Sequence, residues 1–126
     1  MTLRRSELEH FVRTIMSKRD QDHRVQLITE KYGTRFISMI KTLNINELTI
    51  TSSLEIIAEE VLSNEWTLSH VLVLLVFCIE LDEYCRSKQY IWYSQDNLIE
   101  TIVNILWRVG FIVPSILDHF KICCIL

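Results

Sequence analysis

The sequence predicts an all-α protein that forms one helical domain over residues 1–126, and three observations support this fold class. The chain has only two glycines and one proline, and it lacks the Asn-Gly and Asp-Gly pairs that close β-hairpins. Apolar residues make up 49% of the chain, which is enough to fill a core at this length without disulfide bonds or bound metal ions. Most of these residues recur at helical spacing. We therefore expect five amphipathic helices around or beside one apolar helix.

The apolar helix is centred on Val71–Ile79, the longest unbroken apolar run in the chain. Its flanks, Thr67–His70 and Glu80–Tyr84, contain no glycine, proline or turn cluster, so the segment reaches a length that strands rarely have. A helix that is apolar all round must be covered by other elements. It is also shorter than the roughly 20 apolar residues of a membrane span. The run therefore predicts a central core helix.

The first two amphipathic helices are expected over residues 3–18 and 24–43. Asp22 is the candidate N-cap of the second helix. The apolar stripe of that helix consists of Val25, Ile28, Tyr32, Phe36, Met39, Ile40 and Leu43. Gly33 interrupts the helix interior, where glycine costs about 1 kcal/mol relative to alanine. It therefore marks either close packing or a functional contact.

Residues 44–51 are expected to form a polar connection that holds at most a short helix. The pair Ser52 and Glu55 has the spacing of a capping box that starts a third long helix, and Ser63-Asn64-Glu65 is expected to end it. After the core helix, residues 86–93 are expected to form a loop.

Ser94 is the expected N-cap of a helix over 95–109, and Gly110 fits its C-terminal cap. Pro114 fits the first turn of a last short helix over 114–121.

The composition argues against catalysis and against nucleic-acid binding. A net charge of -3 and a pI near 5.8 give no electrostatic footprint for a polyanion. Phosphate-binding loops, dinucleotide fingerprints and nucleophile elbows are missing. The adjacent carboxylates Glu59–Glu60 and Asp82–Glu83 point in different directions on a helix, so we expect solvated faces rather than an acid–base pair. The histidines His10, His23, His70 and His119 lack metal-ligand spacing. We therefore expect that the protein is not an enzyme and that it has neither a cofactor nor a metal site.

The cysteines indicate a reducing compartment. Cys78 lies inside the apolar run, Cys85 follows it, and Cys123 and Cys124 are adjacent, which is not the arrangement of a disulfide framework. The N-terminus also lacks the apolar core and cleavage site of a secretory signal.

A longer pattern runs from Ser53 to Leu81, SLEIIAEEVLSNEWTLSHVLVLLVFCIEL. Ala58–Leu62 is similar to the end of one family helix, Thr67–His70 falls where that family usually has Asn-Trp-Gly-Arg, and Val71–Phe77 falls on its apolar core helix. The segment resembles the fourth helix, first BH motif and central fifth helix of the Bcl-2 family. Gly33–Phe36 falls at the position of the family's third BH motif, and Pro114–Asp118 is similar to the start of its second BH motif.

The departures from the family pattern point to a particular branch. Asn-Trp-Gly-Arg is absent, Trp66 precedes its tryptophan position by two residues, and Thr34 replaces an acidic residue. The Gly-Gly-Trp of the second motif, the long first loop and a C-terminal membrane span are missing too. Such a short, divergent form resembles a viral Bcl-2 homologue of a large DNA virus. The resemblance implies that the protein is located in the cytoplasm of a host cell, with mitochondrial or other intracellular membranes as a further candidate location.

The resemblance implies an anti-apoptotic function. Family survival proteins hold the amphipathic helix of a pro-apoptotic partner in an apolar groove, and the ligand is read at i, i+4, i+7 and i+11. The residues that would line this groove are Tyr32, Phe36, Met39, Ile40, Ile57, Val61, Leu62, His70, Val71 and Leu74. The alternative for each is a plain core position.

His70 stands where the family has an arginine that pairs with an aspartate of the ligand. Histidine is a weaker substitute whose charge varies near neutral pH, whereas arginine is bidentate and always charged. The hypothesis is therefore a narrow range of ligands and tighter binding at lower pH.

A second interpretation keeps the fold but fills the groove. In it, the protein is an adaptor that acts through self-association as a homodimer or on host innate-immune signalling. The candidate interface residues are Trp66, Tyr90, Trp92 and Tyr93, because tryptophan and tyrosine are favoured at interface cores. An accidental likeness to the family is the third interpretation.

The last four residues, Cys123-Cys124-Ile125-Leu126, fit a prenylation box, with Cys124 as a site for a second lipid. The alternative is an apolar tail that packs on the bundle.

Overall fold

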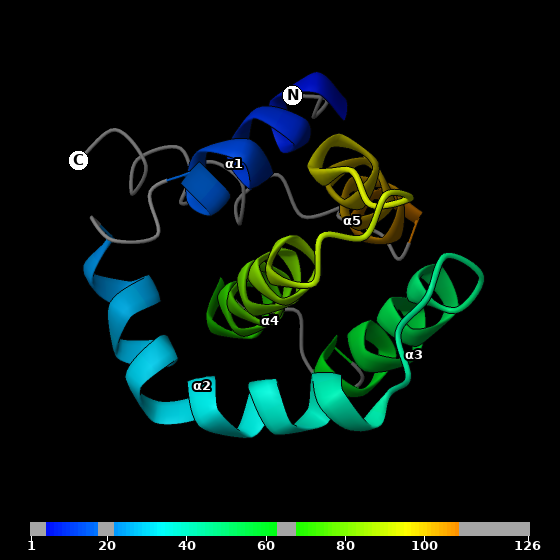
Figure 1. Ribbon diagram of the computed structural model, residues 1–126. Helices are drawn as coiled ribbons and strands as arrows, with labels where there is room; N and C mark the ends of the chain where they lie inside the picture. The colour runs from blue at the N-terminus through cyan, green and yellow to red at the C-terminus, as the bar shows by residue number, and fades with distance from the viewer. Residues whose placement is uncertain (1–4, 18–21, 63–67, 109–126) are drawn as a thin grey trace.

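The computed structural model describes residues 5–17, 22–62 and 68–108, and these residues form five helices without a strand. The helices are α1 (Arg5–Ser17), α2 (His23–Thr42), α3 (Ile50–Leu62), α4 (Leu68–Ser87) and α5 (Gln95–Arg108). Figure 1 shows α4 in the middle of the other four helices. It packs against α1, α2 and α3, while α5 packs against α1 and α3 and completes the ring. The predicted all-α bundle with a central helix is confirmed.

The central helix is buried along most of its length. Every side chain from Val71 to Asp82 is buried except that of Val73, which is partly exposed. Phe77 lies at the centre of the core, together with fully buried leucines and isoleucines from the surrounding helices. Because neighbours cover α4 on several sides, its sequence shows no single apolar stripe. None of the helices in the described ranges has the length and apolar character that crossing a bilayer requires.

The predicted caps of α2 and α5 are confirmed. Asp22 has extended backbone angles, and its carboxylate accepts hydrogen bonds from the amides of Arg24 at 2.9 Å and Val25 at 3.2 Å. The hydroxyl of Ser94 accepts from the amide of Asn97 at 3.4 Å, and its carbonyl accepts from the amide of Leu98 at 3.1 Å. These two residues therefore fix where α2 and α5 begin.

The predicted capping box at Ser52 is wrong, because the helical turn begins earlier. The side-chain oxygen of Asn46 accepts from the amides of Leu48 at 2.8 Å and Thr49 at 3.1 Å, and the Asn46 amide donates to the Thr49 hydroxyl at 3.0 Å. This is a reciprocal pair of the kind that caps helices. Ser52 already lies inside α3, where its hydroxyl donates to the carbonyl of Thr49 at 3.1 Å. The predicted short helix over 114–121, with Gly110 and Pro114, lies outside the described residues.

Candidate functional site

Six of the ten predicted groove residues are buried in the core. They come from α2, α3 and α4 and pack together with the rest of the buried cluster. The six are Phe36, Ile40, Ile57, Leu62, Val71 and Leu74, with exposed fractions between 0% and 7%. These side chains present little surface to a ligand in this arrangement of the helices.

The other four predicted groove residues are partly exposed. Tyr32 and Met39 lie on α2, Val61 lies near the end of α3, and His70 lies in the first turn of α4. The rings of Tyr32 and Phe36 stack with their centroids 5.8 Å apart. The stacked pair therefore extends from the partly exposed ring of Tyr32 to the buried ring of Phe36.

Phe36 joins α2 to the central helix. Its ring meets that of Phe77 edge-on, with centroids 5.5 Å apart and an angle of 81°. Both α2 and α3 pack mainly on α4 rather than on each other. The two helices thus flank α4, and each holds its position chiefly through the central helix.

The loop between α4 and α5 carries an aromatic stack that includes three residues predicted for self-association. The rings of Tyr90 and Trp92 stack with centroids 5.0 Å apart, and Trp92 meets Tyr93 at 86° with centroids 6.2 Å apart. All three side chains are half-buried against the core. Ile91, between them, is fully exposed, and Leu48 in the neighbouring turn is 90% exposed.

Asp82 was expected on a solvated face, and this prediction is wrong. Its carboxylate is buried, accepts hydrogen bonds from the Tyr93 hydroxyl and from Gln95 Nε2 at 3.4 Å, and pairs with Arg86 Nε at 3.2 Å. Burial and the Asp82 hydrogen bond raise the pKa of Tyr93 well above its usual value. Burial and the negative charge of Asp82 raise the pKa of Cys85 to about 11. The network ties the α4–α5 loop to the central helix.

The other three members of the two carboxylate pairs, Glu59, Glu60 and Glu83, are exposed as expected. Trp66, Cys123 and Cys124, predicted for self-association or lipidation, lie outside the described residues, as does His119.

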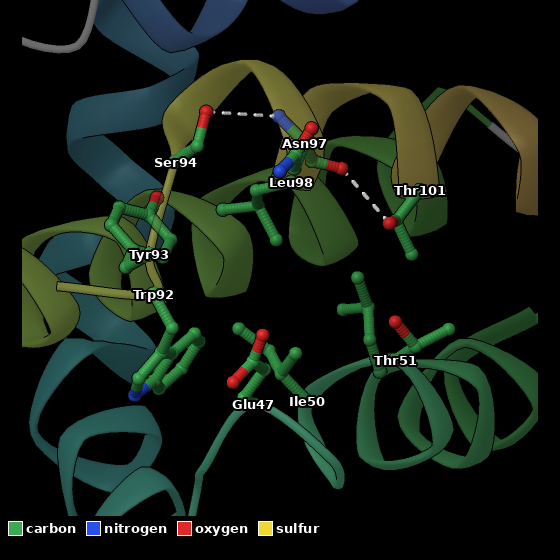
Figure 2. Close-up of a pocket in the computed structure, with 10 residues that line it drawn as sticks. Glu47, Ile50, Thr51, Trp92, Tyr93, Ser94, Asn97, Leu98 and Thr101 are labelled. Carbon is green, nitrogen blue, oxygen red and sulfur yellow. Dashed lines mark hydrogen bonds between the residues drawn. The ribbon is translucent and has the colours of Figure 1, made fainter. Parts of the chain in front are cut away.

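Two pockets lie along the seam between α3 and α5, away from the predicted groove. Figure 2 shows the first, with a volume of about 180 Å³, between the start of α3, the start of α5 and the loop before α5. The second, of about 360 Å³, shares Thr51 and Thr101 with it and continues towards the end of α5 at Arg108. The sequence did not indicate this site, because Thr51, Asn97 and Thr101 are small polar residues on otherwise ordinary amphipathic helices.

Comparisons with protein-family models, with curated proteins and with solved structures find no match. The class that the described residues define is thus an all-α bundle around a buried helix. The relationship to the Bcl-2 family depends on the sequence pattern of Ser53–Leu81 and remains a hypothesis.

Proposed function

We propose that this protein is an anti-apoptotic Bcl-2-like protein of viral type that sequesters pro-apoptotic partners by binding their amphipathic helix. The ligand helix lies over α4, between α2 and α3, with its apolar side towards the core. The observation that carries this proposal is the placement of α2 and α3, which flank the central helix and pack mainly on it rather than on each other. That arrangement suits a helix-binding face.

The partly exposed residues supply the first contacts. Tyr32 and Met39 on α2 and Val61 on α3 offer apolar and aromatic surface, which is what the anchors of an amphipathic helix need. His70, in the first turn of α4, stands where backbone N–H groups and the helix dipole also favour a carboxylate. A ligand aspartate at this point lies close to both the His70 side chain and the backbone N–H groups at the start of α4.

Full docking requires a movement of the helices. Phe36, Ile40 and Leu62 are buried, so the ligand reaches them only when α2 and α3 separate over α4. Such a separation breaks few contacts between α2 and α3 themselves. Part of the binding free energy is nevertheless spent on exposing core surface, and this favours a narrow range of ligands.

Isothermal calorimetry with a panel of pro-apoptotic helical peptides tests the proposal on the full chain at pH 6 and pH 8. We expect a few peptides to bind, and to bind more tightly at pH 6, because histidine side chains in general gain positive charge as the pH falls through this range and then attract a carboxylate. Broad binding without pH dependence contradicts the narrow, charge-assisted mode. Binding by none of the peptides contradicts the function itself.

Two variants of α2 locate the binding face. Met39→Glu places a charge on the proposed face and is expected to weaken peptide binding at least tenfold, because the charge is desolvated beneath the ligand. Leu27→Glu is the matched control, since Leu27 is 51% exposed on the same helix and is not among the groove residues. Equal loss of affinity in both variants would place the ligand elsewhere.

A second candidate function is favoured by the burial of the six groove residues. In it, the protein is a Bcl-2-fold adaptor with an occluded groove that acts through self-association or on host innate-immune signalling. Light scattering on the full chain distinguishes the two: a stable dimer that binds none of the peptides supports the adaptor, and a peptide-binding monomer excludes its self-associating form.

A further inference from the structure

We propose that the pocket between α3 and α5 binds a cationic side chain, by its shape an arginine, presented by a partner protein. This site is separate from the helix-binding face and does not depend on the proposed function. Its lining comes from three places in the chain: Glu47 in the turn before α3 with Thr51 in the first turn of that helix, Trp92 in the loop between α4 and α5, and Asn97 and Thr101 near the start of α5.

Charge selects the ligand class. Glu47 carries the single ionisable carboxylate of the lining, and the lining contains no basic residue. Glu47 is exposed, and no cation of the described chain pairs with it. A cationic group in the pocket therefore gains a charge-assisted hydrogen bond without displacing an existing ion pair.

The size of the pocket selects a side chain rather than a larger molecule. Its volume of about 180 Å³ is below the roughly 300–1,000 Å³ of sites for drug-sized ligands. The buried side chains of Leu54 and Leu98 form an apolar part of the lining, and polar groups surround it. This combination matches an arginine or lysine, which has an apolar stem and a charged head.

The arrangement of the walls favours arginine. Figure 2 shows Trp92, Glu47 and Ile50 on one side of the pocket and Ser94, Asn97 and Thr101 on the other. An indole and a carboxylate in the lining of one pocket suit a guanidinium, which stacks on aromatic rings and donates several hydrogen bonds in its own plane. The stack with Tyr90 and the contact with Tyr93 hold the indole of Trp92 in place.

The acceptors on the α5 side are also fixed before a ligand arrives. The Ser94 hydroxyl accepts a hydrogen bond from the backbone amide of Asn97 at 3.4 Å, and the Thr101 hydroxyl donates one to the backbone carbonyl of Asn97 at 2.9 Å. The lone pairs of the Thr101 oxygen remain able to accept. The site thus needs little ordering on binding, which limits the entropic cost.

The test is a nuclear magnetic resonance titration of the full chain with N-acetyl-arginine methylamide at constant ionic strength. We expect saturable millimolar binding, with shifts confined to the Trp92 indole and to the backbone amides of Thr51, Asn97 and Thr101. The citrulline analogue, which has the same shape without the charge, is expected to bind at least about tenfold more weakly. Equal binding of citrulline, or the absence of saturable shifts at these residues, overturns the proposal.

Matched variants assign the charge to one residue. Glu47→Gln keeps the size of an exposed side chain, so the fold is retained, and it is expected to weaken arginine binding by about tenfold. Glu59→Gln removes the same charge from an exposed position on α3 outside the pocket and is expected to leave binding unchanged. If the two variants weaken arginine binding equally, the binding reflects only a general attraction between charges, and the proposed site is wrong.

Discussion

The hydroxyl of Tyr93 donates a hydrogen bond to the carboxylate of Asp82, across the turn that joins α4 to α5. Asp82 is buried, so this bond and the pairing with Arg86 compensate for the removal of a charge from water. Tyr93 also lines the pocket between α3 and α5. One side chain therefore connects the central helix, the loop and the candidate arginine site.

Tyr93→Phe is expected to lower the free energy of unfolding by about 2 kcal/mol at pH 7, because a hydrogen bond to a buried charge is lost. Tyr32→Phe is the matched control, since its hydroxyl makes no hydrogen bond within the described chain, and it should change stability by less than about 0.5 kcal/mol. The measurement is urea unfolding at equilibrium. Equal effects of the two substitutions would show that the Asp82 bond contributes little.

The same bond has a pH dependence with a defined sign. The folded state raises the pKa of Tyr93, so the phenol keeps its proton in the fold at pH values where the unfolded chain has lost it. The contribution of Tyr93 is complete below its unfolded pKa of about 10 and is lost as pH rises above that value. The stability difference between the wild type and Tyr93→Phe should therefore narrow at alkaline pH.

Asp22→Ala is expected to destabilise the protein by about 1 kcal/mol at pH 7, because the amides of Arg24 and Val25 lose their acceptor. Desolvation raises the pKa of Asp22, but the hydrogen bonds from the Arg24 side chain and from the two amides outweigh it, and the pKa is lowered. A lowered folded pKa means that this stability is present above about pH 3.9 and is lost as pH falls through the folded value.

Urea unfolding at pH 7 and pH 3 measures both parts of the Asp22 effect. Asp22→Asn is the matched control: it keeps the capping oxygen without the charge, so it should retain most of the stability at pH 7. The difference in unfolding free energy between the wild type and Asp22→Asn should shrink at pH 3. A difference that grows as pH falls would mean that the carboxylate is not stabilised by its partners.

Cys78 and Cys85 are expected to resist thiol reagents in the folded state. Both are buried and unpaired, and burial raises the pKa of each thiol, to about 11 for Cys85. Only the thiolate reacts, so at pH 8 Cys85 should react at least about 100-fold more slowly than a free cysteine. A double Cys123→Ser, Cys124→Ser variant leaves these two thiols to be counted with a chromogenic disulfide, first in buffer and then in urea. Rapid reaction of either thiol in buffer would show that the core opens readily.

The sequence pattern predicted the features that depend on nearby residues. The apolar run Val71–Ile79 determined the central helix, and Asp22 and Ser94 determined two helix starts through hydrogen bonds to amides two or three residues ahead. The start of α3 was predicted wrongly because Ser52 with Glu55 and Asn46 with Thr49 have the same spacing. Local sequence alone did not distinguish the two pairs.

The features that depend on distant partners were not predictable. The chain reverses after α4, where Gln89 has a positive φ of 55°, and this turn brings Tyr93 and Gln95 back to Asp82. The acid was therefore expected in solvent, since its partners are not its neighbours in sequence. The pocket between α3 and α5 likewise depends on the separation of two helices, which no spacing within either helix encodes.

Gly33→Ala is expected to stabilise the protein by about 0.5–1 kcal/mol, because alanine favours the helix interior and reduces the freedom of the unfolded chain. Gly33 is buried, but a Cβ atom there would lie 3.5 Å from Thr29 Cγ2 and 4.0 Å from Glu80 Oε1, which are ordinary contacts. Urea unfolding measures the change, and Ser38→Ala on the exposed side of α2 reports helix propensity alone. Destabilisation by Gly33→Ala would show that α2 and α4 need the missing side chain for close packing. A more stable variant with weakened peptide binding would instead assign Gly33 to the ligand contact.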